Sequence, residues 1–205
     1  MKLFLTAFSL IFLLSSCHNS AKNYSEEIKN FQYNLNLFYN NPEESPLTKK
    51  ELKTFKTLEF FEINKKYEVE ATLELTPNAP IFEMKTTTDR LPLYKKYAIA
   101  KFSIDEKVLE LSIYQSQHLE TSIEFDNHLF LPFNDLTNGT LSYGGGRYID
   151  IEIPAKNSKT ITIDFNKAYN PYCTYNYKYS CPIPPVENNL KIEIKAGVKS
   201  YKKHL

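Results

Sequence analysis

Apolar residues between positions 25 and 42 recur at the spacing of an α-helix. Ser25 is placed to cap the first turn, Pro42 ends the run, and the apolar stripe consists of Ile28, Phe31, Leu35 and Phe38. Residues 48–51 (Thr-Lys-Lys-Glu) have the capping-box pattern, which predicts a second, shorter helix that continues through Phe55. The sequence therefore predicts two helices before any strand.

The apolar period changes to two from residue 67 onward. Residues 67–75 alternate between apolar and polar, which predicts a strand with one face on a core and the other in water. Residues 98–104 and 108–114 alternate in the same way on either side of a short polar turn and predict a β-hairpin. Residues 129–133 are apolar but contain Pro132, which favours an edge strand or a buried loop.

Further alternating segments complete the predicted sheet. Residues 149–153 and 161–165 flank a turn and predict another hairpin, and residues 190–196 predict the last strand. About seven short strands after two N-terminal helices indicate a mainly β fold, an antiparallel sandwich or barrel. A chain of 205 residues fits one domain, which we place at residues 24–205.

The first residues are organised like a bacterial secretion signal. A lysine precedes an apolar stretch that is too short to span a bilayer. The run Leu-Ser-Ser-Cys that ends at Cys17 resembles the lipobox of bacterial lipoproteins, which implies cleavage after residue 16 and acylation of Cys17. We expect a signal peptide at 1–16, a short tether at 17–23, and anchoring to the bilayer of the cell envelope. His18 in place of an aspartate favours the outer membrane, and the alternative is an ordinary secreted protein with a chance cysteine.

Charge narrows the range of partners. The chain carries 25 basic and 24 acidic residues, so no net field attracts it to nucleic acid, which we exclude as the main partner. His118 and His128 offer two imidazoles without the tight spacing of known metal sites, so no metal site is predicted. No segment predicts a cofactor.

Arginine is rare in this chain. Of the 25 basic residues only Arg90 and Arg147 are arginines. This suggests that these two positions need a group that pairs with two acceptors at once or stacks, which a lysine cannot do. Arg147 follows Gly144, Gly145 and Gly146, three of only five glycines. Glycines can adopt positive φ angles and turn successive N–H groups toward an anion.

Two interpretations of this glycine-rich stretch stay open. In one, the glycines form a hairpin turn and Arg147 pairs with a buried acid. In the other, Arg147 lies in a polar concavity beside the turn, Arg90 reaches the same space, and the two bind a small anionic or polar ligand. The second interpretation makes Arg147, Arg90 and the three glycines candidate ligand-binding residues.

Residues 166–189 have little periodicity and contain five tyrosines, four prolines and two cysteines. So long a loop in one domain is usually functional or tied down, and we expect it to fold near the glycine turn. Cys173 and Cys181 are predicted to form a disulfide that holds it, given an oxidising compartment. A nucleophilic cysteine would need a histidine base, and no histidine lies in the motif-bearing segments.

The same segment supplies amphipathic groups that suit a pocket for a small molecule. Asn166, Asn170 and Tyr175 are the candidate ligand-binding residues here. The alternative is a hydrogen-bonded loop, because Asn side chains favour turns by bonding to their own backbone.

Five segments together resemble one bacterial family, domain-of-unknown-function family 1684. The resemblance covers about residues 45–197, and the segments that carry it are residues 86–90, 129–139, 143–148, 164–173 and 180–185. It implies a single domain, and it carries over no catalytic or binding role.

Three functional hypotheses follow from these observations. The first is a lipid-anchored envelope protein that binds a small anionic or polar ligand. The second is an envelope hydrolase in which Asp164 or Asp150 does acid–base work and Arg147 stabilises negative charge. The third is an interaction protein whose exposed tyrosines dock a partner. The sequence does not decide whether the protein is an enzyme.

Overall fold

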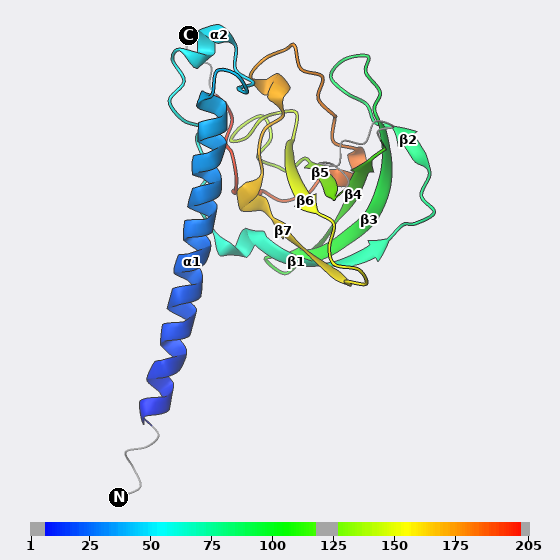
Figure 1. Cartoon of the computed structure of the whole chain (residues 1–205). Coiled ribbons are helices and arrows are strands. Elements are labelled where there is room, and N and C mark those ends of the chain that lie inside the picture. The colour runs from blue at the N-terminus through cyan, green and yellow to red at the C-terminus, as the bar shows by residue number, and fades with distance from the viewer. Residues whose placement is uncertain (1–6, 118–126, 202–205) are drawn as a thin grey trace, which may run out of the picture.

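The computed structural model describes residues 7–117 and 127–201, with side chains from Asn23 onward. A long helix, α1 (Ala7–Asn40), leads into the β domain, and its second half lies beside that domain (Figure 1). The predicted signal peptide and tether fall partly on the first half of α1 and partly on residues 1–6. The side chain of Cys17 lies outside the described residues. In the described part of the chain, no helix is both long and apolar enough to cross a membrane.

The two predicted helices differ in extent from their prediction. The first ends at Asn40 as expected, but it begins before Ser25, which lies within it. The second, α2 (Lys49–Leu52), is a single turn that does not reach Phe55. Its capping box is confirmed: the Glu51 N–H donates to Thr48 Oγ1 at 3.2 Å, and the Thr48 N–H donates to Glu51 Oε2 at 3.2 Å.

The fold is mainly β, as predicted, and consists of one antiparallel seven-stranded sheet. The strand order is β6-β5-β4-β3-β1-β7, and β2 pairs with the first part of β3. The strands are β1 (Glu68–Leu75), β2 (Ile81–Glu83), β3 (Leu93–Ile104), β4 (Lys107–Ser116), β5 (His128–Phe133), β6 (Arg147–Glu152) and β7 (Thr160–Asp164). The connections contain the 3₁₀ helices η1 (Lys65–Tyr67), η3 (Phe165–Lys167), η4 (Tyr172–Thr174) and η5 (Val186–Asn188).

The sheet curls until its two ends, β6 and β7, come close together (Figure 1). The predicted hairpin of β3 and β4 is confirmed, and its turn residues Asp105 and Glu106 have positive φ angles of 48° and 64°. The predicted hairpin of residues 149–153 and 161–165 is wrong, because β6 pairs with β5 and β7 pairs with β1. Alternation located these strands but could not identify their partners.

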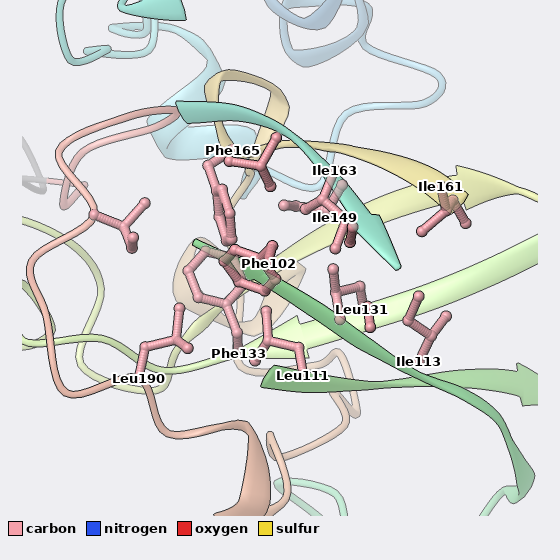
Figure 2. Packing of buried hydrophobic residues seen from close by; sticks show 14 of the residues in the cluster. Phe102, Leu111, Ile113, Leu131, Phe133, Ile149, Ile161, Ile163, Phe165 and Leu190 are labelled. Carbon is pink, nitrogen blue, oxygen red and sulfur yellow. The ribbon is translucent and has the colours of Figure 1, made fainter. Parts of the chain in front are cut away.

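The concave face of the sheet holds the main hydrophobic core. Figure 2 shows aromatic and branched aliphatic side chains from strands at both ends of the sheet meeting in this space. Phe165 of η3 is fully buried there, with its ring centroid 5.2 Å from that of Phe133 and 5.8 Å from that of Phe102. The curl therefore gives one continuous core to strands that do not pair.

Residues 129–133 form an interior strand rather than an edge strand. β5 pairs with β6 along its whole length and meets β4 only where Tyr114 faces Phe130. Beyond that point Pro132 has no N–H to offer, and the side chain of Asn188 lies between the strands instead. Its Oδ1 accepts from the Ser112 N–H at 2.8 Å, and its Nδ2 donates to the carbonyls of Ser112 at 2.8 Å and Pro132 at 2.7 Å.

The predicted last strand, residues 190–196, does not join the sheet. Its apolar residues Leu190, Ile192, Ile194 and Ala196 do face the core, as the alternation predicts. Its polar backbone groups bind side chains: the Ile194 N–H donates to Asp135, and the carbonyls of Ile194 and Ala196 accept from Arg147. An arginine and an aspartate thus replace a neighbouring strand.

Candidate functional site

Arg147 and Asp135 form a buried ion pair at the start of β6. Arg147 is 0% exposed, and its Nη2 lies 2.7 Å from Asp135 Oδ2 and 2.8 Å from the Ile194 carbonyl, while Nη1 donates to the Ala196 carbonyl. The guanidinium carbon lies 5.3 Å from the Phe133 ring centroid. This is the buried pair of the first interpretation, and such complete burial leaves Arg147 no surface with which to bind a ligand.

The glycine turn is shaped by close packing. Gly146 has a φ of +90°, and a Cβ there would lie 2.6 Å from Pro184 and 2.8 Å from the Phe133 carbonyl. A Cβ on Gly145 would lie 2.6 Å from the Tyr143 ring, whereas one on Gly144 would make only ordinary contacts. Close neighbouring protein atoms therefore explain why residues 145 and 146 are glycines. The contact with Pro184 confirms that the 166–189 segment folds near this turn.

Arg90 lies elsewhere and is exposed. Its Nη2 donates to the Ser180 carbonyl at 2.8 Å, and its own carbonyl accepts from Thr86 Oγ1 at 2.6 Å. The expectation that Arg90 and Arg147 reach one space is wrong, because Arg147 faces the core from β6 while Arg90 lies on an outer loop. The rarity of arginine marked two different structural positions.

Asn166 joins α1 to the sheet through a buried network. Tyr24 of α1 donates to Asp164 at 3.0 Å, and Asn166 Nδ2 donates to the Tyr24 hydroxyl at 2.9 Å and to the Asn64 carbonyl at 3.0 Å. Burial raises the pKa of Asp164, against the effect of hydrogen bonds from Asn166 and Tyr24. Asp164, a candidate for acid–base work, is thus buried and already hydrogen-bonded.

Asn170 and Tyr175 are also buried, and they connect their loop to the C-terminal segment and to α1. Asn170 Nδ2 donates to the Tyr175 hydroxyl at 3.2 Å and to the Lys199 carbonyl at 2.9 Å. The Tyr175 ring packs edge-on against Tyr39 of α1, at a centroid distance of 4.8 Å. Together with Asn166, these residues match the alternative of a hydrogen-bonded loop, and they hold the helix and the C-terminal segment on the domain.

Cys173 and Cys181 lie next to each other as free thiols in this structure. The Cys173 N–H donates to Cys181 Sγ at 3.1 Å. The hydrogen bond from Cys181, with those from Tyr143 and Thr87, lowers the pKa of Cys173 to about 6 against the effect of burial. The sequence identified this pair of cysteines but gave no sign of the two hydroxyl groups beside it.

A pocket of about 400 Å³ opens at one end of the curled sheet. This is the end where β1 and β4 begin and β3 ends, and four lysines line it: Lys66, Lys107, Lys191 and Lys195. We call this pocket the lysine mouth. Its apolar lining comes from the buried Tyr67, Ile104 and Ile192 and the exposed Leu136. Sequence reasoning missed it because its residues are spread over some 130 positions and carry no motif.

The buried ion pair and the lysine mouth share structural parts. Leu136 of the mouth follows Asp135, and its N–H donates to the carbonyl of Ile192, also of the mouth, at 2.9 Å. Arg147 donates hydrogen bonds to the carbonyls of Ile194 and Ala196, which follow Ile192 in the same segment. The Arg147–Asp135 pair therefore supports two of the segments that line the pocket.

A histidine and a carboxylate pair on the outer face. His128 Nε2 lies 3.1 Å from Asp150 Oδ1, and the Tyr169 hydroxyl donates to Asp150 Oδ2 at 2.7 Å. The hydrogen bond to Asp150 raises the pKa of His128. Within residues 7–117 and 127–201, no three His, Cys, Asp or Glu side chains are grouped to hold a metal ion.

Comparison with known protein families shows to which family the chain belongs. The family described as "Protein of unknown function (DUF1684)" matches residues 53–199. The chain belongs to this family. The DUF1684 match confirms the resemblance seen in the five sequence segments.

A solved structure agrees with the DUF1684 fold. The solution NMR structure of an uncharacterised protein from Haloarcula marismortui is similar to this chain with a TM-score of 0.70 and 30% sequence identity. The similarity covers 91% of this chain and 99% of that one. The comparison with curated proteins finds no match.

Several of the family segments meet around the cysteine pair. The Cys181 N–H donates to Thr87 Oγ1 at 3.1 Å, the Cys173 N–H donates to Cys181 Sγ at 3.1 Å, and the Tyr148 hydroxyl donates to the Pro182 carbonyl. Residues 86–90, 143–148, 164–173 and 180–185 thus each contribute to one small region. These four segments are far apart in the sequence but lie together in the fold.

Proposed function

We propose that the protein is a lipid-anchored protein of the bacterial envelope that binds a small anionic ligand in the lysine mouth. The observation that carries the binding proposal is the pocket of about 400 Å³ lined by four lysines and by several apolar residues. Its size lies within the range of small-molecule sites.

The charge of the lysine mouth supports an anionic ligand. Lys66 pairs with Asp105 at 2.9 Å, and Lys195 pairs with Glu193 at 2.7 Å. Lys107 and Lys191 have no carboxylate within ion-pair distance among the described residues. The pocket therefore carries an excess of two positive charges, which suits a ligand with one or two negative groups.

The apolar part of the lining indicates that the ligand also has an apolar part. The lining includes the buried residues Tyr67, Ile104 and Ile192, and Leu136 adds an exposed apolar side chain. Burying apolar ligand surface there contributes about 25 cal/mol per Å². We therefore assign the ligand to small amphiphilic anions, such as an aryl phosphate or a short fatty acid.

Thermal unfolding of the mature chain with phenyl phosphate, inorganic phosphate or decanoate tests this proposal. Binding stabilises the folded state by RT ln(1 + [L]/Kd), about 2.7 kcal/mol at a ligand concentration of 100 Kd. We expect phenyl phosphate or decanoate to raise the melting temperature more than inorganic phosphate does. The double variant Lys107→Gln with Lys191→Gln should lose this shift, whereas Lys156→Gln, outside the pocket, should retain it. Equal shifts in both variants, or none in the wild type, would contradict the proposal.

The lipid anchor is supported by the lipobox-like run that ends at Cys17. Mass spectrometry of the membrane fraction should find a mature protein that begins at an acylated Cys17. Cys17→Ser should remain unacylated and leave the membrane fraction. An unmodified N-terminus in the wild type would rule out the anchor without affecting the pocket.

A disulfide between Cys173 and Cys181 is a further part of the proposal. The 3.1 Å contact between the Cys173 N–H and Cys181 Sγ already places the residues side by side, and the envelope is an oxidising compartment. Non-reducing peptide mapping of envelope-derived protein should recover the two peptides linked. Two alkylatable thiols would contradict it.

The hydrolase alternative receives less support from the geometry. It requires a carboxylate beside Arg147, but Asp164 bonds to Tyr24 and Asp150 bonds to His128 and Tyr169. Asp150 and Arg147 also point to opposite faces of β6, because they are three residues apart in a strand. The third hypothesis requires a surface of exposed tyrosines. In the cysteine-containing segment one tyrosine, Tyr177, is strongly exposed, at 91%.

A further inference from the structure

The two cysteines differ in their access to solvent. Cys173 lies in η4 and is half-buried, whereas Cys181 is buried. The Cys173 N–H donates to Cys181 Sγ at 3.1 Å, so the buried inner cysteine is in direct contact with the less buried outer one. An external molecule can therefore reach Cys173 first, and Cys181 is placed to react with whatever Cys173 has bound.

Hydroxyl groups surround the outer sulfur. Thr87 Oγ1 accepts from the Cys181 N–H at 3.1 Å, and the hydroxyls of Thr87 and Tyr143, from two different segments, both lower the pKa of Cys173. Hydrogen bonds to a sulfur favour its thiolate, and with the one from Cys181 they hold the pKa of Cys173 at about 6. The pKa of Cys181 is raised far above its usual range, first by the bond to Cys173 and then by burial.

The backbone around the pair is firmly held. The Thr87 N–H donates to the Cys181 carbonyl at 2.9 Å, and the Cys181 N–H donates to Thr87 Oγ1 at 3.1 Å. Ser180 Oγ lies 2.6 Å from Thr88 Oγ1 and 2.9 Å from Thr86 Oγ1. The loop of residues 86–90 thus holds the inner cysteine in place, while the outer one stays half-buried.

We propose that Cys173 and Cys181 form a thiol–disulfide exchange site for small disulfides that carry carboxylates, with Cys173 as the nucleophile and Cys181 as the resolving thiol. The Cys173 thiolate attacks one sulfur of a disulfide R–S–S–R′, forms a mixed disulfide with R–S, and releases R′–S⁻. The released thiolate takes the proton of Cys181. The Cys181 sulfur then attacks Cys173 Sγ and expels R–S⁻, so the protein is oxidised to its internal disulfide and R–S–S–R′ is reduced to two thiols.

Arg90 gives the site its preference for an anionic substrate. Arg90 is exposed, and one of its side-chain nitrogens donates to the carbonyl of Ser180, the residue before Cys181. Its charge reaches the inner sulfur, where it lowers the pKa of Cys181 against the larger opposing effects. Because Arg90 is exposed, its remaining guanidinium N–H groups can bind a carboxylate of the substrate.

Trapping with glutathione disulfide on the mature chain, after mild reduction, tests the proposal. In Cys181→Ser we expect one lasting glutathione adduct on Cys173, seen by intact mass and peptide mapping. In Cys173→Ser we expect no adduct, because the buried Cys181 is neither accessible nor ionised. The wild type should pass to the internal disulfide and release two equivalents of glutathione.

The rate of Cys173 alkylation against pH, measured in Cys181→Ser, tests the role of Tyr143. Adding Tyr143→Phe should move the midpoint of this profile up by about one pH unit, since one hydrogen bond to the thiolate is lost. Tyr177→Phe, in the same segment but 91% exposed, should leave the midpoint unchanged. Arg90→Gln should slow the reaction with glutathione disulfide several-fold and leave that with uncharged 2-hydroxyethyl disulfide unchanged.

Three results would overturn the proposal. One is a glutathione adduct that forms as readily in Cys173→Ser as in Cys181→Ser. Another is an internal disulfide that forms in the envelope but does not open with dithiothreitol in the folded state, which would make it purely structural. The third is that Arg90→Gln changes the rate with charged disulfides and the rate with uncharged disulfides to the same extent. None of these results bears on the lysine mouth.

Discussion

The Arg147 guanidinium and the Asp135 carboxylate form an ion pair, 2.7 Å between Nη2 and Oδ2, in which both side chains are 0% exposed. Burial lowers the pKa of Arg147, and the charge and hydrogen bond of Asp135 act against that effect. Asp135 Oδ1 accepts from the N–H groups of Thr137 at 2.8 Å and Ile194 at 3.1 Å. The pair thus connects the start of β6 with the segment that follows β5 and with the C-terminal segment.

Replacing Arg147 by lysine should destabilise the fold. An ammonium group cannot reach the Asp135 carboxylate and both carbonyls with the spread of a guanidinium. Breaking a buried pair typically costs about 3–5 kcal/mol, and Arg147→Lys should lose a substantial part of that. Urea unfolding measures the loss, and the exposed Arg90→Lys is the matched control with a change below about 0.5 kcal/mol. Equal stabilities of the two variants would show that the pair does not hold the fold.

Gly146→Ala should also be strongly destabilising. The residue has a φ of +90°, and a Cβ would lie 2.6 Å from Pro184, 2.7 Å from Asn134 and 2.8 Å from the Phe133 carbonyl. Strain of this kind costs about 1–3 kcal/mol before any displacement of neighbours. In Gly144→Ala the nearest atom lies 3.6 Å away, so this control should change the free energy of unfolding little. Thermal unfolding of the two variants compares them directly.

Asn188→Ala should weaken the junction of β4 and β5. The change leaves the Ser112 N–H and the carbonyls of Ser112 and Pro132 without the partner they have now. Each buried polar group left unpaired costs about 1–3 kcal/mol. Hydrogen exchange should show the Ser112 amide losing its protection in the variant. An unchanged exchange rate at Ser112 would mean that Asn188 does not replace the missing strand bond.

Tyr24→Phe should cost more stability at neutral pH than in acid. Burial raises the pKa of Asp164 above its unfolded value. The stability that this shift contributes to the folded state is therefore present at low pH and is lost as the pH rises through the folded pKa. The Tyr24 hydroxyl favours the charged carboxylate, and removing it raises the folded pKa further. We expect a loss of about 1.5–3 kcal/mol at pH 7 and a smaller one at pH 3.5.

Chemical unfolding at the two pH values measures this difference. Tyr33→Phe, on the same helix but 62% exposed, is the control. A loss of the same size at both pH values would show that Tyr24 does not bond to the ionised form of Asp164.

Local patterns predicted the parts of the fold that depend on neighbours in sequence. The capping box at residues 48–51, the end of α1 at Asn40, the strand β1 and the β3–β4 hairpin are all confirmed. The number of strands is also confirmed, although β2 was not predicted and residues 190–196 are not a strand. Each of these successes rests on a periodicity or a turn within a few residues.

The remaining features depend on contacts between distant segments. Residues 190–196 alternate like a strand, but Arg147 and Asp135 bind their backbone in place of a partner strand. β6 and β7 alternate like a hairpin, but the curl of the sheet gives each a different partner. The lysine mouth has no local signature, because lysines from three separate segments meet only after the sheet has curled.

Chemical-shift mapping by NMR with phenyl phosphate tests the central claim most directly, because it locates the ligand as well as detecting it. Anion binding in the lysine mouth should shift the amides of residues 66–67, 104–107 and 191–195 in a saturable way. The effect should weaken with added salt, since exposed charges are screened. Shifts that cluster instead around Arg90 and Ser180, or no saturable shifts at any residue, would contradict a ligand site at this end of the sheet.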